Sequence, residues 1–158
     1  MSKQKTMKGF TLIEILVVVA LIAILTAITF IAINPAKNFA DTRNAQRSSD
    51  VTQILNAVTQ YTSEQGNELD DFGVIPLCTA TPKCIGNNAV TPTPSPADAC
   101  INLATLLVDT YIVGIPMDPL VGTAADTGYT ICQTAGGRVE ITVPTAHQEN
   151  GKVISVKR

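Results

Sequence analysis

A run of 22 residues with a single charge, Leu12 to Ile33, limits what the N-terminal part of this chain can form. As a helix with a rise of about 1.5 Å per residue, the run would span roughly 33 Å, the thickness of a bilayer's hydrocarbon core. The one charge is Glu14. An ionised carboxylate costs on the order of 2.5–3.5 kcal/mol at a membrane helix centre and less near its end. We therefore expect a membrane helix whose acid meets a cationic partner.

The residues before the run indicate proteolytic processing. Residues 1–9 carry Lys3, Lys5 and Lys8, contain no acid and end in a glycine. The apolar run that follows is too long for the h-region of an ordinary secretory signal peptide. A cut after Gly9 would create a new α-amine at the next residue, Phe10. In a helix that residue and the acid stand four positions apart on one face, so the amine could meet a carboxylate of its own chain or of a neighbour.

The order of lysine-rich leader, Gly9-Phe10 junction, Glu14 and apolar run resembles the processing site of type IV pilins and the related pseudopilins. The resemblance covers residues 5–35. It implies cleavage after Gly9 by a membrane prepilin peptidase, which also N-methylates Phe10. It further implies that Glu14, the fifth residue of the mature chain, pairs with the terminal amine of an adjacent subunit during assembly. The alternative is an uncleaved signal anchor that carries an acid by chance.

Charges and cysteines predict on which side of the membrane each part lies. Three lysines precede the span, and three basic residues, Lys37, Arg43 and Arg47, follow it within a comparable distance, so the positive-inside count is a tie. The leader charges are denser, however, and all four cysteines lie beyond residue 77, which is typical of a part that reaches an oxidising compartment. We expect the N-terminus inside the cytoplasm and the rest outside, on the cell surface after assembly.

The residues after the run predict a second helical segment and one small head. Pro35 lacks a backbone donor, so a bend is expected at that point. An apolar stripe at helical spacing then follows, formed by Val51, Ile54, Leu55, Val58 and Tyr61. The predicted parts are a cleaved leader (1–9), an apolar helix (10–35) and a head (36–158) that begins with a helix over 36–64.

The remainder of the head predicts an antiparallel sheet. Residues 77–99 form a Pro- and Thr-rich loop, with a spacer or an O-glycosylated segment as the two interpretations, and Ser95-Pro96 begins a short helix over 96–109. Three alternating β-branched runs within 127–157 predict strands, namely Tyr129–Cys132, Val139–Val143 and Val153–Val156. The expected fold is α+β and pilin-like. A long N-terminal helix, with its apolar half protruding, packs on a small head with a three-stranded antiparallel sheet.

Four cysteines allow three disulfide pairings. Cys78 and Cys84 are near neighbours in one loop, whereas Cys100 begins the predicted short helix and Cys132 ends a predicted strand. We therefore predict the bonds Cys78–Cys84 and Cys100–Cys132. A zinc site is the alternative, but the spacings do not form CxxC pairs, and the only histidine, His147, lies away from the cysteines in the sequence.

Catalytic motifs are not found. The sequence has no nucleophile elbow, phosphate-binding glycine loop or metalloprotease pair, and His147 lies in a polar segment typical of a solvated turn. Residues 115–119 and 128–130 resemble the corresponding region of major pseudopilins and of some bacterial pilins, and in major pseudopilins a loop there binds calcium. The resemblance makes Asp118 and Asp126 calcium candidates, but the loop shows no dense pattern of oxygen ligands, so we expect these acids to cap turns, with calcium binding as the alternative. We expect no enzyme and no cofactor.

Composition excludes some partners and agrees with others. The net charge is -2; without the three leader lysines, 8 basic residues face 13 acidic ones, which gives -5. With 4% aromatic residues and no tryptophan, direct nucleic-acid binding is not expected. The predicted function is that of a structural subunit that polymerises through its apolar helix into a helical, extracellular type IV filament. The resemblance implies an assembly ATPase and a membrane platform protein as further partners. The alternative is a pseudopilin of a type II secretion or DNA-uptake system, forming a short periplasmic or cell-wall fibre.

Overall fold

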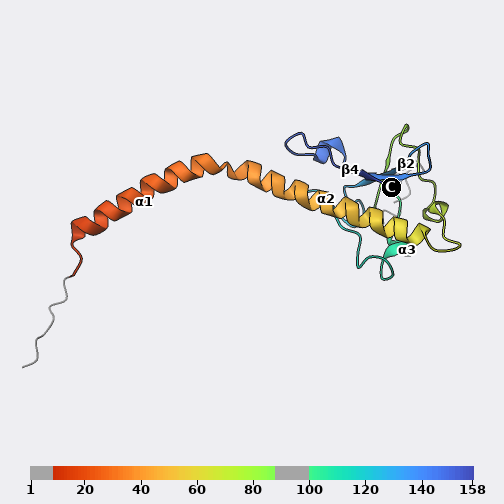
Figure 1. Cartoon of the computed structure of the whole chain (residues 1–158), viewed down its shortest axis with the longest axis horizontal. Helices are drawn as coiled ribbons and strands as arrows, with labels where there is room; N and C mark the ends of the chain where they lie inside the picture. The colour runs from red at the N-terminus through yellow and green to blue at the C-terminus, as the bar shows by residue number, and fades with distance from the viewer. Residues whose placement is uncertain (1–8, 88–99) are drawn as a thin grey trace, which may run out of the picture. The chain divides into compact units, whose positions relative to one another are not determined.

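A computed structural model describes residues 9–87 and 100–158 of the chain. These residues divide into two compact units, one that ends at Phe39 and a head formed by Ala40–Arg158. Helix α1 (Leu12–Ile33) belongs to the first unit, and helix α2 (Pro35–Thr62) begins there and continues into the head. Figure 1 traces the chain from α1 in red and orange, through α2, to the labelled strands β2 and β4 in blue.

The predicted break at Pro35 is confirmed, one residue earlier. Asn34 ends α1 with a φ of 44°, a left-handed conformation that asparagine tolerates better than most residues. Its side-chain Oδ1 accepts the N–H of Lys37 at 3.3 Å, so the residue that ends α1 also caps α2. Proline suits the first position of a helix because the missing donor would have no partner there. Helix α1 begins at Leu12 and helix α2 ends at Thr62, slightly inside the predicted limits of residues 10 and 64.

Helix α2 packs on the head through one stripe of buried residues. All five predicted stripe positions are buried. The stripe also extends further toward the N-terminus than the apolar residues do, at alternating spacings of four and three. Its members along that line are Ala40, Asn44, Arg47, Val51, Ile54, Val58 and Tyr61. The first half of the stripe is therefore largely polar and the second half apolar.

Within residues 9–87 and 100–158, the sheet has four antiparallel strands in sequential order, one more than predicted. They are β1 (Lys83–Cys84), β2 (Thr130–Gln133), β3 (Val139–Thr142) and β4 (Ser155–Lys157). The three predicted strands are confirmed, and β1 lies within the predicted loop 77–99. Ile131 and Ile141 face each other across β2 and β3, and both are fully buried in the core that contains the apolar half of the α2 stripe.

The predicted helix over 96–109 is largely wrong. Its described part holds only one helical turn, α3 (Ala104–Leu107), and its predicted start at Ser95-Pro96 lies outside the described residues. Ile101 is extended because its backbone pairs with the segment around Ile85 in a parallel bridge. Two further single turns complete the head, η1 (Leu69–Phe72) and η2 (Thr145–His147).

Candidate processing and assembly site

Helix α1 exposes apolar side chains on every face. None of its residues is buried within the chain. Val17 and Val18 on one part of the helix and Ile31 near its end are all about half exposed or more. By length and composition α1 is the one helix of the described residues that could cross a membrane. A helix that is apolar all round needs an apolar environment that its own head does not provide.

The two threonines within α1 do not disturb that apolar surface. The Thr26 hydroxyl donates to the carbonyl of Ile22 at 2.7 Å, and the Thr29 hydroxyl donates to the carbonyl of Leu25 at 3.0 Å. Each hydroxyl is thus satisfied within the helix, as a polar group in a membrane or a protein bundle must be. Glu14 is the only residue of α1 that brings a charge.

Glu14 closes the N-terminus of α1. Its Oε2 accepts the backbone N–H and the hydroxyl of Thr11, each at 3.3 Å, while Thr11 Oγ1 accepts the N–H of Glu14 at 3.3 Å. This reciprocal capping box satisfies two donors that the first turn of a helix leaves free. In the uncut chain, the acid therefore already has partners.

Phe10 and Glu14 were expected on one face of the helix, but in the uncut chain they do not share a helix face. Phe10 precedes the helix, because Thr11 is the N-cap and has an extended backbone. It is 81% exposed, and Gly9 next to it is exposed as well. A Cβ added at Gly9 would meet no atom within 4 Å. The junction thus lies open, and the leader lysines fall outside the described residues.

The head contains a buried ionic network that was not predicted from the sequence. Arg47 is fully buried and donates through Nε to Asp118 Oδ2 at 2.6 Å and through Nη2 to Asp118 Oδ1 at 3.2 Å. Its Nη1 reaches Glu149 Oε2 at 2.7 Å, and Arg43 forms a second, bidentate pair with the same carboxylate. The network joins α2 to two distant loops. The signal for it was the spacing: Arg47 lies one step of four before Val51 on the stripe.

The network shifts the acidity of its members. Burial disfavours the charge of Asp118, but Arg47 and the N–H groups of Leu120 and Val121 outweigh burial, so the pKa of Asp118 lies below its usual 3.8. Hydrogen bonds from Arg43, joined by Arg47, lower the pKa of Glu149 from 4.5 to about 2. Both carboxylates are therefore ionised at neutral pH, and the two guanidinium groups are their counter-ions.

A second buried acid, Asp50, lies on α2 directly before Val51. It is 1% exposed, and it accepts the Tyr129 hydroxyl at 2.7 Å and the Gln46 amide at 3.0 Å. Burial, followed by this hydrogen bond, raises the pKa of the Tyr129 phenol. Asp50 thus ties α2 to the start of β2.

The predicted disulfide pairing is wrong. The bonds are Cys78–Cys132 and Cys84–Cys100, with Cα atoms 4.9 and 4.6 Å apart. Backbone pairing explains both. The N–H of Cys78 donates to the carbonyl of Gln133 at 2.8 Å, which aligns residue 78 with the end of β2.

The N–H of Ile101 likewise donates to the carbonyl of Cys84 at 2.8 Å, so the parallel bridge between residues 85 and 101 brings the second pair together. Proximity in the sequence was the wrong guide because extended segments, not the loop, set these distances. All four cysteines are described, and none is free.

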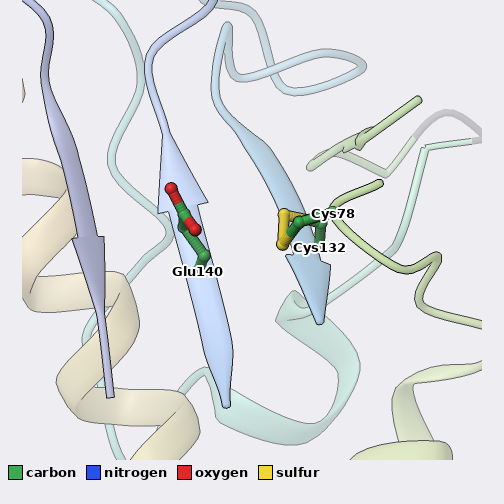
Figure 2. A group of neighbouring side chains, drawn as sticks. All are labelled: Cys78, Cys132 and Glu140. Carbon is green, nitrogen blue, oxygen red and sulfur yellow. A yellow bond between two sulfur atoms is a disulfide. The ribbon is translucent and has the colours of Figure 1, made fainter. Parts of the chain in front are cut away.

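The disulfides also decide the metal hypotheses for the cysteines. Cys78, Cys132 and Glu140 lie together, with Cys132 on β2 opposite Glu140 on β3 (Figure 2). Cys84, Cys100 and Asp126 form a similar group. Sulfur atoms joined in a disulfide are not thiolates, and zinc binding by cysteine requires the thiolate. With both disulfides formed, the four cysteines therefore provide no thiolate ligand for zinc.

The calcium candidates have partners within the protein. The Asp118 carboxylate accepts two hydrogen bonds from Arg47, and it also accepts the N–H groups of Leu120 at 2.9 Å and Val121 at 3.2 Å. Asp126 Oδ1 accepts the N–H of Gly128 at 2.9 Å, which is the turn-capping role. A calcium ion at Asp118 would have to displace a guanidinium; calcium binding stays an untested prediction.

His147 lies half-buried in η2, with Nδ1 3.3 Å from the carbonyl oxygen of Gly128. No serine, cysteine or carboxylate is recorded as a hydrogen-bond partner of this ring among the described residues. The arrangement is that of a turn residue and provides no nucleophile–base pair.

An α+β head follows an apolar helix with an acid in its first turn, an arrangement consistent with membrane anchoring. Residues 4–30 match the family model of the prokaryotic N-terminal methylation motif. This motif is the class III signal peptide of type IV pilins and pseudopilins. The match therefore supports the interpretation of the chain as a pilin-like or pseudopilin-like precursor. The motif is a structural one and does not define an enzyme family. Comparisons with curated proteins and with solved structures give no match.

Proposed function

We propose that this chain is the subunit of an extracellular type IV pilus-like filament, produced from a precursor that a prepilin peptidase cuts after Gly9 and methylates at Phe10. Helix α1 is the observation that carries the proposal, because it is apolar on all faces, unburied and charged only at Glu14. A simple anchor has no need of the acid. Outside a bilayer, identical helices of other subunits are the natural cover, and heterologous contacts between them permit open-ended growth.

Glu14 is proposed to change partners during assembly. In the precursor its carboxylate accepts hydrogen bonds from the neutral donors of Thr11. Cutting creates a charged amine at Phe10, and an incoming subunit's Glu14 can bind the amine of its neighbour. A charge-assisted hydrogen bond is roughly twice as strong as a neutral one. The pair also offsets part of the cost of keeping a carboxylate in an apolar environment.

Leaving the membrane requires work from outside the subunit. Moving α1 from lipid into a bundle of identical helices exchanges one apolar environment for another, so the hydrophobic gain is small. We therefore propose that an assembly ATPase, acting through a membrane platform protein, supplies the energy. The heads, which carry most of the acidic side chains, remain in water.

Electron microscopy of sheared cell-surface material, with antibody labelling, tests the proposal. The wild type is compared with Glu14→Ala and Glu14→Gln. Glutamine keeps a side-chain carbonyl that can accept the N–H of Thr11, so this variant separates helix capping from charge. Both variants should be cut and membrane-inserted but form few filaments.

A normal filament yield from Glu14→Gln would refute the proposed ion pair. Wild-type protein found only as a membrane monomer, in cells with an intact assembly machine, would refute the filament. Short fibres confined to the cell envelope would instead support the pseudopilin role.

A further inference from the structure

The connection between β3 and β4 forms an arm that makes several polar contacts with α2. We define the arm as residues 144–153; it lies between two buried residues, Val143 and Ile154, but contains no buried residue itself. Glu149 binds Arg43 and Arg47, and its backbone carbonyl accepts the Asn44 amide at 2.9 Å. At the tip of the arm, Asn150 Nδ2 donates to Asp41 Oδ1 at 3.0 Å.

The tip combines the features that expose an asparagine to attack by its own backbone. Asn150 is the one asparagine of the chain that glycine follows. Both residues are exposed and have positive φ, 55° for Asn150 and 68° for Gly151. A Cβ at Gly151 would meet no atom within 4 Å, so the space beside its Cα is open. Among the described residues, the backbone hydrogen bonds of the turn do not use the N–H of Gly151 as a donor.

We propose that Asn150 is a site of spontaneous covalent modification. The backbone nitrogen of Gly151 attacks Cγ of Asn150 and gives up its proton, the bond from Cγ to the amide nitrogen breaks, and ammonia leaves. The product is a five-membered cyclic imide. Water then adds to one of the two imide carbonyls and opens the ring, which leaves either aspartate or isoaspartate at position 150. Water is the only co-reactant.

The modification weakens the attachment of the arm. The amide of Asn150 is the donor to Asp41, so its conversion to a carboxylate removes the hydrogen bond and places two acids opposite each other. The new charge also follows directly after Glu149 in the chain. Isoaspartate adds a further change, because the backbone then runs through the former side chain. The arm should therefore open more often, while the core around Ile154 is left in place. This inference does not depend on filament assembly.

Peptide mapping of the aged full-length chain in detergent micelles tests the chemistry. Trypsin releases residues 139–152 as one peptide with a single asparagine. Asn56 is the internal control, because it is exposed but the next N–H is committed to helix α2. In mildly alkaline buffer, the acid form and enzymatically detected isoaspartate should appear at Asn150 well before any change at Asn56. Equal or slower conversion at Asn150 would overturn the proposal.

Hydrogen exchange of the arm tests the structural consequence. Asn150→Asp loses one hydrogen bond, so exchange within residues 144–153 should rise roughly fivefold. The double variant Asn150→Asp with Asp41→Asn restores a donor and an acceptor in reversed order, and its exchange should return toward that of the wild type. Unchanged exchange in Asn150→Asp, or no recovery in the double variant, would show that this contact does not hold the arm.

Discussion

Removal of Arg47 should expose how much the head depends on its buried ion pair. Arg47→Met keeps most of the side-chain volume but deletes the hydrogen bonds to Asp118, Glu149 and Asn44. Asp118 is 3% exposed, so it would be left as a buried charge without its counter-ion. Breaking such a pair typically costs about 3–5 kcal/mol. For a head of this size, that corresponds to a fall in Tm of roughly 10–20 °C.

The pH dependence gives this prediction a distinctive sign. In the wild type the pKa of Asp118 lies below its usual 3.8, so the pair's contribution is present above that value and is lost as the pH falls. Without Arg47, burial dominates and should raise the pKa of Asp118. Protonation then relieves the buried charge, so the stability deficit of Arg47→Met should shrink between pH 7 and pH 4.

Urea unfolding of the disulfide-bonded head, residues 40–158, followed by circular dichroism, measures these effects. Arg47→Met with Asp118→Asn should be more stable than Arg47→Met alone, because no unpaired charge remains. Arg138→Met, an exposed arginine in the β2–β3 turn, is the matched control and should change stability by about 0.5 kcal/mol or less. A cost below about 1 kcal/mol for Arg47→Met, or no recovery in the double variant, would refute the reasoning.

Three further predictions concern processing, the disulfides and acid stability. Gly9→Val should leave the precursor folded, because a Cβ there meets nothing, yet block cutting; mass spectrometry of the membrane fraction should find the leader retained, and a mature N-terminus at Phe10 would contradict this. Cys132→Ser removes the disulfide that joins residues 54 positions apart, and Cys84→Ser removes the one that joins residues 16 positions apart. In urea unfolding of the oxidised head, the first should cost about 4 kcal/mol of stability and the second about 3 kcal/mol. A larger loss from Cys84→Ser would reject the loop-length argument. Glu149 has a pKa of about 2 against an ordinary 4.5, so its contribution is present above pH 4.5 and is lost between pH 4.5 and pH 2. In Glu149→Gln, the urea midpoint of unfolding should therefore change less with pH between pH 4.5 and pH 2 than it does in the wild type. An unchanged pH dependence would count against the pairing of Glu149 with Arg43 and Arg47.

The apolar helix α1 and the methylation motif at its N-terminus could be predicted from the sequence. The small residue, the acid in the first turn and the apolar run follow one another in the sequence. They can therefore be recognised without knowing the tertiary structure. The same holds for the break near Pro35 and for the stripe from Val51 to Tyr61, because proline chemistry and helical periodicity act over a few residues. Three strands were predictable for the same local reason.

The contents of the head could not be read in this way. Arg47 and Asp118 are 71 positions apart, and nothing near either residue in the sequence announces the partner. Cys78 lies nearer in sequence to Cys84, yet it bonds Cys132 because its backbone pairs with the end of β2. Local patterns identified α1, α2 and three of the strands, but they missed β1 and the extended backbone at Ile101, which depend on pairing with distant segments. Only the joint packing of those segments decided which charges are buried and which sulfur atoms meet, since a burial cost or a disulfide depends on distances that the fold as a whole sets.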